Sequence, residues 1–301
     1  MPDAISVYTV DGIDYLITAN EGDSRDWNGY SNEIEVNFGK GKTSPTGKIT
    51  ADNSGLTGKV TFFDTSDYDG PNNENDYLFG GRSSTIFKAD EQSLQEIYTT
   101  GNDFEVKTAA YLPNNFNCSN DDATIDDRSG KKGPEAEAVT IGQIEDKTFA
   151  FIGLERIGGI MVYDITNPEK TEFVNYINSR DFSTDIGGDD SPEGIHFIAG
   201  NDSITGKPQL VVAYEVSGTV GVYDLTLQKN SDQSGDDKTD NPSQEPTVEE
   251  TNNSSNTNTN NKNHSVNTGD ASNIAITIIS LISTIVLITI LMKKDKVLAE
   301  D

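Results

Sequence analysis

Short apolar runs separated by polar turns recur through the first three quarters of the chain. Between Gly133 and Ile165 three such runs follow one another, at Ala138–Ile144, Thr148–Leu154 and Gly158–Ile165. Each run has the length of a strand, is rich in Val, Ile and Phe, and is bounded by turn residues. The pattern predicts an antiparallel meander.

The meander occurs in three copies that share features position by position. Each copy opens with Pro and an acid, places a glutamate after its second strand and an aspartate after its third. The opening pairs are Pro2-Asp3, Pro134-Glu135 and Pro192-Glu193, the glutamates are Glu21, Glu155 and Glu215, and the aspartates are Asp64, Asp164 and Asp224. Repeats of this kind predict an all-β chain folded as a β-propeller, each copy being a blade.

The first copy carries a long insertion between its second and third strands. The insertion, Ser24–Gly55, contains the only tryptophan, Trp27, and is either a functional loop or a lid that only packs. The third strand is then expected to end at Phe63-Asp64. A weaker fourth unit is expected at Asp76–Gly101, which gives three to four blades and an incomplete propeller.

The chain is strongly acidic, with 50 Asp and Glu against 22 Lys and Arg and a formal net charge of −28. This balance argues against nucleic acid as a partner, because binding to nucleic acid draws on Lys and Arg. Two interpretations stay open, a well-solvated extracellular surface and an adaptation to a calcium-rich habitat. The single cysteine, Cys118, excludes an intrachain disulfide.

The composition divides the chain into four parts. Residues 1–228 hold the repeats, and residues 229–272 are rich in Asn, Ser, Thr and Asp, which predicts a disordered stalk. Residues 273–292 include the apolar run Ile274–Met292, long enough for a transmembrane helix. The basic residues of the tail, 293–301, place the C-terminus in the cytoplasm and the repeats outside.

The end of the chain resembles the cell-wall sorting signal of Gram-positive surface proteins. Thr268-Gly269, the apolar span and the short basic tail match its order, whereas Ser265-Val266 stand where the common motif has Leu-Pro. The resemblance implies cleavage between Thr268 and Gly269 by a sortase and linkage to peptidoglycan. Simple retention as a single-pass membrane protein stays open.

The repeated acids are predicted to meet. The start of one strand lies beside the end of its antiparallel neighbour, so each opening acid is expected beside the glutamate that ends strand two. With the first strands innermost, these acids surround the channel mouth of a propeller. The predicted site consists of Asp3, Glu21, Asp23, Glu135, Glu137, Glu155, Glu193 and Glu215.

Two explanations of these carboxylates stay open. A ring of carboxylates repels itself unless cations, arginines or backbone amides compensate the charge, and oxygen ligands suit calcium or magnesium rather than zinc. In the structural alternative the acids cap turns and join neighbouring units through Arg25 and Arg156. Asp64, Asp164 and Asp224 are expected to close turns on the opposite face.

Five stretches together closely resemble the choice-of-anchor I family of bacterial surface proteins, which is related to the animal mesenchyme-specific cell surface glycoprotein. They are ITANEGDSRDW, GPEAEAV, GLERIGGIMVYDITNP, SPEGIHFI and LVVAYEVSGTVGVYDL. The resemblance covers about residues 1–228 and implies a YVTN/WD40-like propeller that is exported and held by a C-terminal anchor. The family's propeller is larger, so we expect this chain, which shows no signal peptide, to be the C-terminal part of a longer protein.

The expected function is an extracellular, surface-anchored propeller that binds an unidentified extracellular ligand without catalysis. The sequence contains no HExxH, CxxC or P-loop motif and allows no Ser–His–Asp set, so no catalytic residue is assigned. The alternative is a metal-dependent phosphoesterase with carboxylate ligands at the channel mouth, since some members of the resembled family are fused to metallophosphatase domains.

Overall fold

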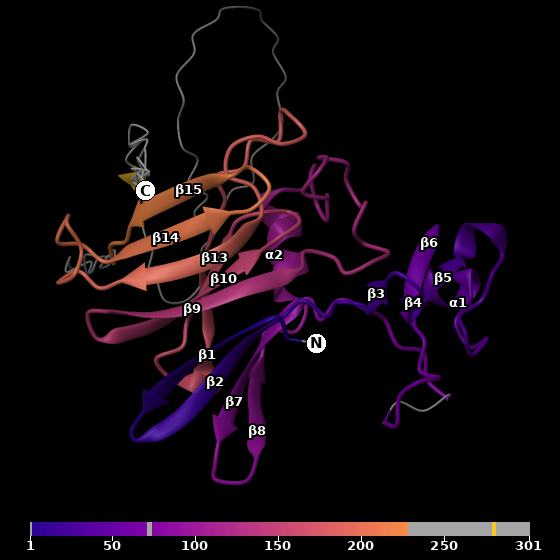
Figure 1. The fold of residues 1–301 in the computed structure, drawn as a ribbon, viewed down its shortest axis with the longest axis horizontal. Helices are drawn as coiled ribbons and strands as arrows, with labels where there is room; N and C mark the ends of the chain where they lie inside the picture. Colours follow the sequence, from indigo (N-terminus) through magenta and orange to yellow (C-terminus); the bar gives the residue numbers. More distant parts are fainter. Residues whose placement is uncertain (1, 71–73, 228–278, 281–301) are drawn as a thin grey trace, which may run out of the picture.

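The protein is described by a computed structural model that covers residues 2–70, 74–227 and 279–280, and it is mostly β, with few helices (Figure 1). Three four-stranded antiparallel sheets form the body. Sheet 1 contains β1 (Ala4–Val10), β2 (Ile13–Asn20), β7 (Ser83–Ala89) and β8 (Leu94–Thr99). Sheet 2 contains β9 (Ala136–Ile144), β10 (Lys147–Leu154), β11 (Ile160–Asp164) and β12 (Glu172–Ile177). Sheet 3 contains β13 (Pro192–Ile198), β14 (Gln209–Tyr214), β15 (Thr219–Asp224) and β16 (Ile279–Ser280).

Sheet 2 lies between the other two and is apolar on both faces. Along β10, Ala150 and Ile152 pack into the core shared with sheet 1, while Phe149 and Phe151 pack into the core shared with sheet 3. All four side chains are fully buried. A strand covered on both faces needs a continuous apolar run instead of an alternating one, which is what the sequence of β10 provides.

The first strands of the three sheets lie next to one another. Strand β9 contacts both β1 and β13, and the sheets fan outward from this line (Figure 1). The ends of β2 and β10 are therefore brought toward the same region. Within the described residues the sheets do not close into a barrel or a ring.

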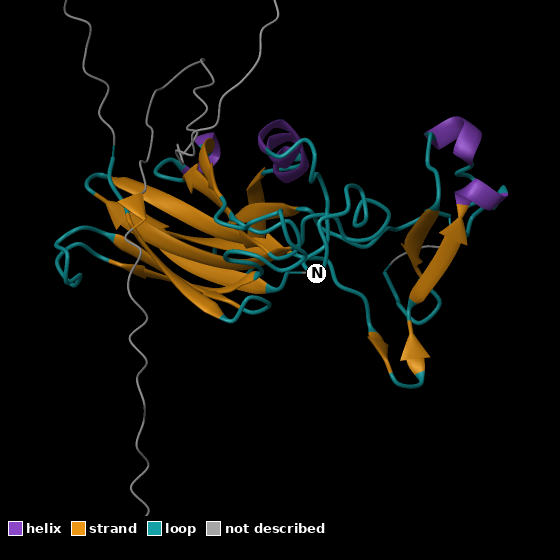
Figure 2. Cartoon of the chain, turned by 90° about the horizontal axis from the view of Figure 1, so that it is seen from above, coloured by secondary structure: helices purple, strands orange, loops and turns teal. Residues whose placement is uncertain are grey.

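The insertion in the first copy forms a small unit of its own, which projects from the body (Figure 2). We call it the β3–β6 insertion. It contains β3 (Asp26–Trp27), β4 (Tyr30–Ser31), β5 (Glu33–Asn37), η1 (Phe38–Lys40), α1 (Ala51–Ser54) and β6 (Lys59–Phe63). Strand β6 pairs with β5, and Val36, Phe38, Val60 and Phe62 bury a separate small core.

Two predictions about this region are wrong. Strand β6, expected as the third strand of the first copy, belongs to the insertion because its apolar side chains face the insertion's own core. The third and fourth strands of sheet 1 are β7 and β8, so the segment Asp76–Gly101 is not a further blade. Strand β7 takes this place because Ile86 pairs with Ile17 and enters the core shared with sheet 2.

The registers of the three sheets align the copies more accurately than the sequence does. Ala4 pairs with Ala19, Ala138 with Gly153, and Gly194 with Ala213, each pair ending two residues before a repeated glutamate. The equivalent opening acids are therefore Asp3, Glu137 and Glu193. Glu135 instead matches Ser191, because their carbonyls accept the equivalent bonds from the amides of Glu155 and Glu215, and both have positive φ, 54° and 62°.

Helices are short and peripheral. Helix α2 (Asp103–Tyr111) follows sheet 1, and its Phe104 is buried against Tyr163 of sheet 2. The 3-10 turn η2 (Pro168–Lys170) links β11 to β12. No helix in the described part of the chain has the length and apolar character needed to cross a bilayer. The predicted stalk, span and basic tail lie outside the described residues, apart from Ile279–Ser280, which pair with β15 as strand β16.

Candidate cation site

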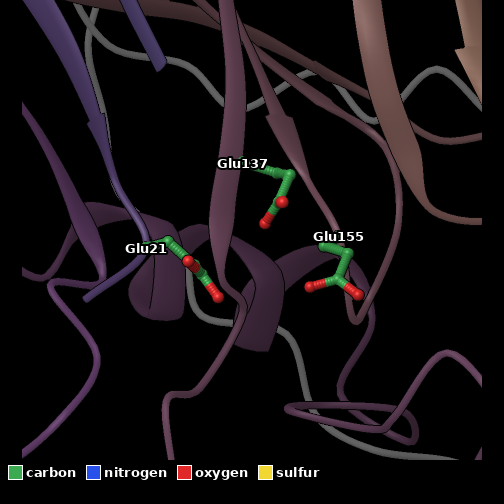
Figure 3. Close-up of side chains that lie close together, drawn as sticks. All are labelled: Glu21, Glu137 and Glu155. Atoms are coloured by element: carbon green, nitrogen blue, oxygen red, sulfur yellow. The ribbon is translucent and has the colours of Figure 1, made fainter. Parts of the chain in front are cut away.

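Three glutamates from two sheets converge where the first strands meet. Glu21 follows β2, Glu155 follows β10, and Glu137 lies near the start of β9 between them. One carboxylate oxygen from each lies within 4.8 Å of the other two, and Figure 3 shows the side chains directed toward a common space. We call these three residues the glutamate triad. They come from positions that the repeat places at strand starts and ends, which is why chain segments far apart in sequence supply them.

Glu137 is the least compensated member of the triad. Its Oε2 is buried and has no hydrogen-bond partner among the described residues. Burial, together with the nearby carboxylates of Glu155, Glu21, Asp3 and Glu193, raises the pKa of Glu137 to about 8. A carboxylate in such surroundings either holds a proton near neutral pH or requires a cation.

The other two triad members have polar partners, yet their pKa values are also raised. Burial, with a smaller contribution from Glu135, raises the pKa of Glu155 to about 7, although Arg156, 3.2 Å away, opposes the rise. Burial also raises the pKa of Glu21, and its ion pair with Lys132 only partly offsets that effect. All three carboxyls thus bind protons more readily than exposed glutamates do.

Glu135 behaves differently because three cations surround it. Its side chain is fully buried and forms ion pairs with Arg128, with Lys132 at 2.8 Å and with Arg156 at 3.1 Å. Burial alone would raise its pKa, but these cations hold it below the ordinary value. Lys132 also contacts Glu21 and Asp23. Glu135 is therefore an ionised structural group that fixes the cations beside the triad.

Close backbone packing at Gly22, Gly80 and Gly81 lets Lys132 approach Glu21. The amides of Gly80 and Gly81 donate to the carbonyls of Gly22 and Glu21, both at 3.0 Å. A Cβ on Gly80 would lie 2.6 Å from the Cα of Lys132, and Gly80 has a φ of +85°. Only a residue without a side chain permits this approach.

A buried arginine and an asparagine hold the surrounding loop. Asn120 donates to Glu155 at 3.0 Å and to Ser191 at 2.9 Å, and so joins sheets 2 and 3. Arg180 donates to the carbonyl oxygens of Ser119 and Arg156 and pairs with Asp190 at 3.3 Å. The side chains of Arg180 and Asp190 are both fully buried. Arg180 thereby fixes the backbone next to Asn120 and Glu155.

The remaining predicted residues lie around the triad. Asp3 and Glu193 are near enough to raise the pKa of Glu137, and Glu193 hydrogen-bonds to Glu215. Asp23 reaches the cluster through Lys132, at 2.7 Å, although its side chain is 52% exposed. The structure thus gathers all eight predicted carboxylates in one region. Whether they bind a metal or another ligand stays a prediction.

The predicted pairing partners of the acids are confirmed in part. Arg156 forms ion pairs with Glu135 and Glu155, as expected of a structural cation. Arg25 stacks over Tyr68 instead, 5.3 Å from the ring centre, within the β3–β6 insertion region. Two of the aspartates predicted to close turns do so: Asp64 accepts from the amide of Ser66 and Asp164 from that of Thr166. Asp224 instead accepts from the side chain of Gln209, its partner on the neighbouring strand.

The sequence interpretation missed the loop whose basic side chains compensate part of the negative charge of the eight carboxylates. Asn120, Arg128 and Lys132 lie on the segment between α2 and β9, which has no strand or helix pattern of its own. One signal was available: DDRSGKKGP places three basic residues immediately before the repeat acids of an otherwise acidic chain. Three cations in ion pairs face eight carboxylates, so the region keeps an excess of negative charge.

The arrangement suits a hard cation. Carboxylate oxygens are the ligands that calcium and magnesium prefer, and the unpartnered Oε2 of Glu137 is a donor without a role inside the described protein. Glu21, Glu137 and Glu155 would be the ligands. In the absence of a cation the same oxygens would share protons, as their raised pKa values indicate.

Two known proteins resemble part of this chain. Gigasin-3a from Magallana gigas is 29% identical over an alignment of 168 residues, which covers 50% of this chain and 57% of that protein. The mesenchyme-specific cell surface glycoprotein of Strongylocentrotus purpuratus is 24% identical over an alignment of 205 residues, which covers 57% of this chain and 26% of that protein. The chain thus spans only part of the length of either relative. The choice-of-anchor I domain model matches residues 1–168, which contain sheet 1, most of sheet 2 and the whole triad. The chain therefore belongs to the choice-of-anchor I domain family, which indicates a surface-associated module.

Proposed function

We propose that this chain is part of a surface-displayed β-propeller that acts as a binding module and takes a divalent cation at the glutamate triad. The observation that carries the proposal is the convergence of Glu21, Glu137 and Glu155 within 4.8 Å, with one oxygen of Glu137 buried and unpartnered among the described residues. Calcium is the expected ion because it tolerates irregular sets of carboxylate ligands.

The sheet arrangement supports the propeller. Each sheet is a four-stranded antiparallel meander, the first strands of the three sheets lie side by side, and the same acids recur at equivalent strand ends. Propellers contain 4–8 such sheets around a central channel. On this proposal the carboxylates line the mouth of the channel, and further sheets complete the ring.

Attachment to the cell surface is proposed from the sequence of the C-terminal part. The apolar run Ile274–Met292 is expected to cross the membrane of a Gram-positive bacterium, or to direct the chain to a sortase that cleaves between Thr268 and Gly269 and joins the protein to peptidoglycan. In both cases the sheets face the outside of the cell.

Calorimetry on the full chain in detergent solution tests the cation site. We expect calcium to bind to the wild-type protein with release of protons at pH 7, since Glu137 and Glu155 hold protons there in the metal-free state. Glu137→Gln should weaken binding at least tenfold, whereas Glu96→Gln, an exposed acid of β8, should not change it. Equal binding by wild type and Glu137→Gln would refute the site.

An activity assay on the same protein preparation distinguishes the phosphoesterase from the binding module. Turnover of a generic phosphate ester that is lost with a chelator and in Glu137→Gln, but kept in Glu96→Gln, would favour the hydrolase. Calcium binding without turnover would favour the binding module.

A further inference from the structure

An exposed pair of aromatic side chains lies at the end of the β3–β4 hairpin. Trp27 pairs with Tyr30 across the hairpin, and the two rings stack with their centroids 5.1 Å apart. Trp27 is 59% exposed, so much of the indole is open to solvent although Tyr30 covers one of its faces. Tryptophan is enriched at interfaces, where its ring supplies a large contact area. We call these two residues the aromatic pair.

Internal contacts hold the aromatic pair in place. The Tyr30 hydroxyl hydrogen-bonds with Tyr68, and the hydroxyl of Tyr68 accepts from the side-chain amide of the buried Asn32 at 3.0 Å. Asn32 also accepts from the backbone amide of Arg25 at 2.7 Å, which fixes the base of the hairpin. A surface that is preorganised in this way loses little conformational entropy when a partner binds.

The exposure of Trp27 does not come from an uncovered sheet. Trp27 lies in the β3–β6 insertion, which buries its own small core and projects from the body (Figure 2). Sheet 2 packs against sheet 1, which bears the insertion, and Trp27 is nevertheless exposed. The aromatic pair is thus a surface of the insertion itself and not an outer face of sheet 1 or sheet 3.

The segments that carry and support the aromatic pair are strongly acidic. Residues 22–35 and 63–70 contain seven acids and one base, Arg25. Asp67 is exposed and interacts with the Tyr30 hydroxyl, so it lies beside the pair. This concentration of negative charge attracts cationic groups and repels anionic ones. The seven acids are Asp23, Asp26, Glu33, Glu35, Asp64, Asp67 and Asp69.

The rings beneath the pair already bind a cation of the same chain. The guanidinium of Arg25 lies over the ring of Tyr68, 5.3 Å from its centre. An indole attracts a cation more strongly than a phenol does, yet the ring of Trp27 has no cation over it among the described residues. Arginine suits such a surface better than lysine, because a planar guanidinium stacks on a ring while it donates to a carboxylate.

We propose that the aromatic pair docks a basic polypeptide segment of another protein, whose arginine stacks on the open face of Trp27 while Asp67 supplies the opposing charge. The partner is positively charged, because the acidic insertion would repel an acidic segment. The surface lies outside the glutamate triad, so the inference goes beyond the cation site and does not depend on it.

Tryptophan fluorescence tests the proposal directly, since Trp27 is the only tryptophan of the chain. The full chain in detergent solution, with a chelator present, is titrated with hexa-arginine, with hexalysine and with the neutral sugar chitohexaose. The ionic strength is about 0.15 M, which screens the attraction between exposed charges. We expect hexa-arginine to change the fluorescence and to bind at least about threefold more tightly than hexalysine, whereas chitohexaose should have no effect.

Calorimetry on matched variants assigns the binding to residues. Trp27→Ala should weaken the binding of hexa-arginine at least about fivefold, and Trp27→Phe should recover part of this loss. Asp67→Asn should weaken it about threefold. Leu94→Ala, which shortens another exposed apolar side chain, and Glu96→Gln should leave it unchanged, since both residues lie in β8.

Equal binding of hexa-arginine by the wild type and Trp27→Ala would show only non-specific attraction to an acidic chain and would overturn the proposal. Equal affinity for hexa-arginine and hexalysine would exclude stacking of the guanidinium, and a response to chitohexaose alone would identify a sugar-binding surface instead. Glu137→Gln should bind hexa-arginine like the wild type, so failure of the cation site is distinguishable from failure of this surface. A loss in Glu137→Gln as large as that in Trp27→Ala would place the peptide at the triad and would overturn the proposal too.

Discussion

Lys132 forms an ion pair with Glu21 although 111 residues separate them in the chain. The contact ties the loop before sheet 2 to the end of β2 in sheet 1. Lys132→Met should lower the free energy of unfolding by about 3 kcal/mol, because breaking a largely buried ion pair leaves an uncompensated carboxylate. Urea unfolding checks this, with Lys131→Met, an exposed neighbour, as the matched control. Equal stability of the two variants would show that Lys132 does not hold the cluster.

The stability of the metal-free protein should depend on Glu137 and pH. Its pKa in the folded protein is about 8, above the ordinary 4.5, so the folded state binds this proton more tightly than the unfolded state. The stabilisation of the folded state by protonated Glu137 is then present below pH 4.5 and is lost as the pH rises toward 8.

The measurement is the difference between wild type and Glu137→Gln in urea unfolding with a chelator. The slope of the unfolding free energy against pH should differ between the two proteins by about 1 kcal/mol per pH unit at most, after allowing for the partial solvent exposure of Glu137. Added calcium should remove the pH dependence of the wild type alone. Parallel pH profiles for the two proteins would contradict the raised pKa.

Removal of the buried Arg180 should destabilise the chain strongly. Arg180→Met leaves Asp190 buried without its cation, and burial already raises the pKa of Asp190 to about 6 despite Arg180. The expected loss is about 3–5 kcal/mol. The double variant Arg180→Met, Asp190→Leu should recover part of this loss because no lone charge remains. Thermal or urea unfolding of the wild type and the two variants measures these differences. A double variant less stable than Arg180→Met would contradict the explanation.

Gly80 should be more sensitive to alanine than other glycines with positive φ. Gly80→Ala meets the backbone of Lys132, whereas Gly206→Ala has a similar φ of +71° and no atom within 4 Å of the new Cβ. Gly206→Ala, the control, should lower the free energy of unfolding by about 1 kcal/mol through backbone strain. Gly80→Ala should lower it clearly more. The excess is expected to appear also as weaker calcium binding, because Lys132 and its loop move. Equal losses in the two variants would refute the packing role of Gly80.

Anchoring is tested at Thr268. Thr268→Ala should abolish linkage to peptidoglycan if a sortase processes the chain, and the protein should then be extracted by detergent alone. Ser265→Ala, outside the proposed scissile pair, is the control. Unchanged fractionation of Thr268→Ala would favour simple retention in the membrane.

The sequence was sufficient for the first three strands of sheets 2 and 3 and for the meeting of the acids, because apolar runs of strand length and antiparallel pairing are local signals. It did not predict β12 or β16, the fourth strands of these sheets. It misaligned the second copy by two residues. The dipeptide Pro134-Glu135 has the same residues as Pro192-Glu193, but Ala136 pairs with Leu154 where Pro192 pairs with Tyr214, so Ala136-Glu137 is the true counterpart. The pairing partners that settle this alignment cannot be read from the sequence of the segment alone.

The composition of sheet 1 and the cations of the site could not be predicted from the same rules. Strand β6 ends in Phe63-Asp64 like a third strand, whereas β7 lacks this ending and is recognised only through its pairing with β2. Lys132 and Arg128 lie on a loop, and their positions depend on long-range contacts with Glu21 and Glu135. Local propensity carries no information about such contacts.

The β3–β6 insertion also has a consequence for the order of folding. In sheet 2, Gly153 pairs with Ile160 across a short turn, whereas Asn20 of β2 meets Ser83 of β7 across 63 residues. Pairings of high contact order form slowly, because chain entropy is lost before the contact is gained. When the complete chain refolds, sheets 2 and 3 can therefore assemble while β2 still has an open edge, and this interval is when the chain is most exposed to aggregation.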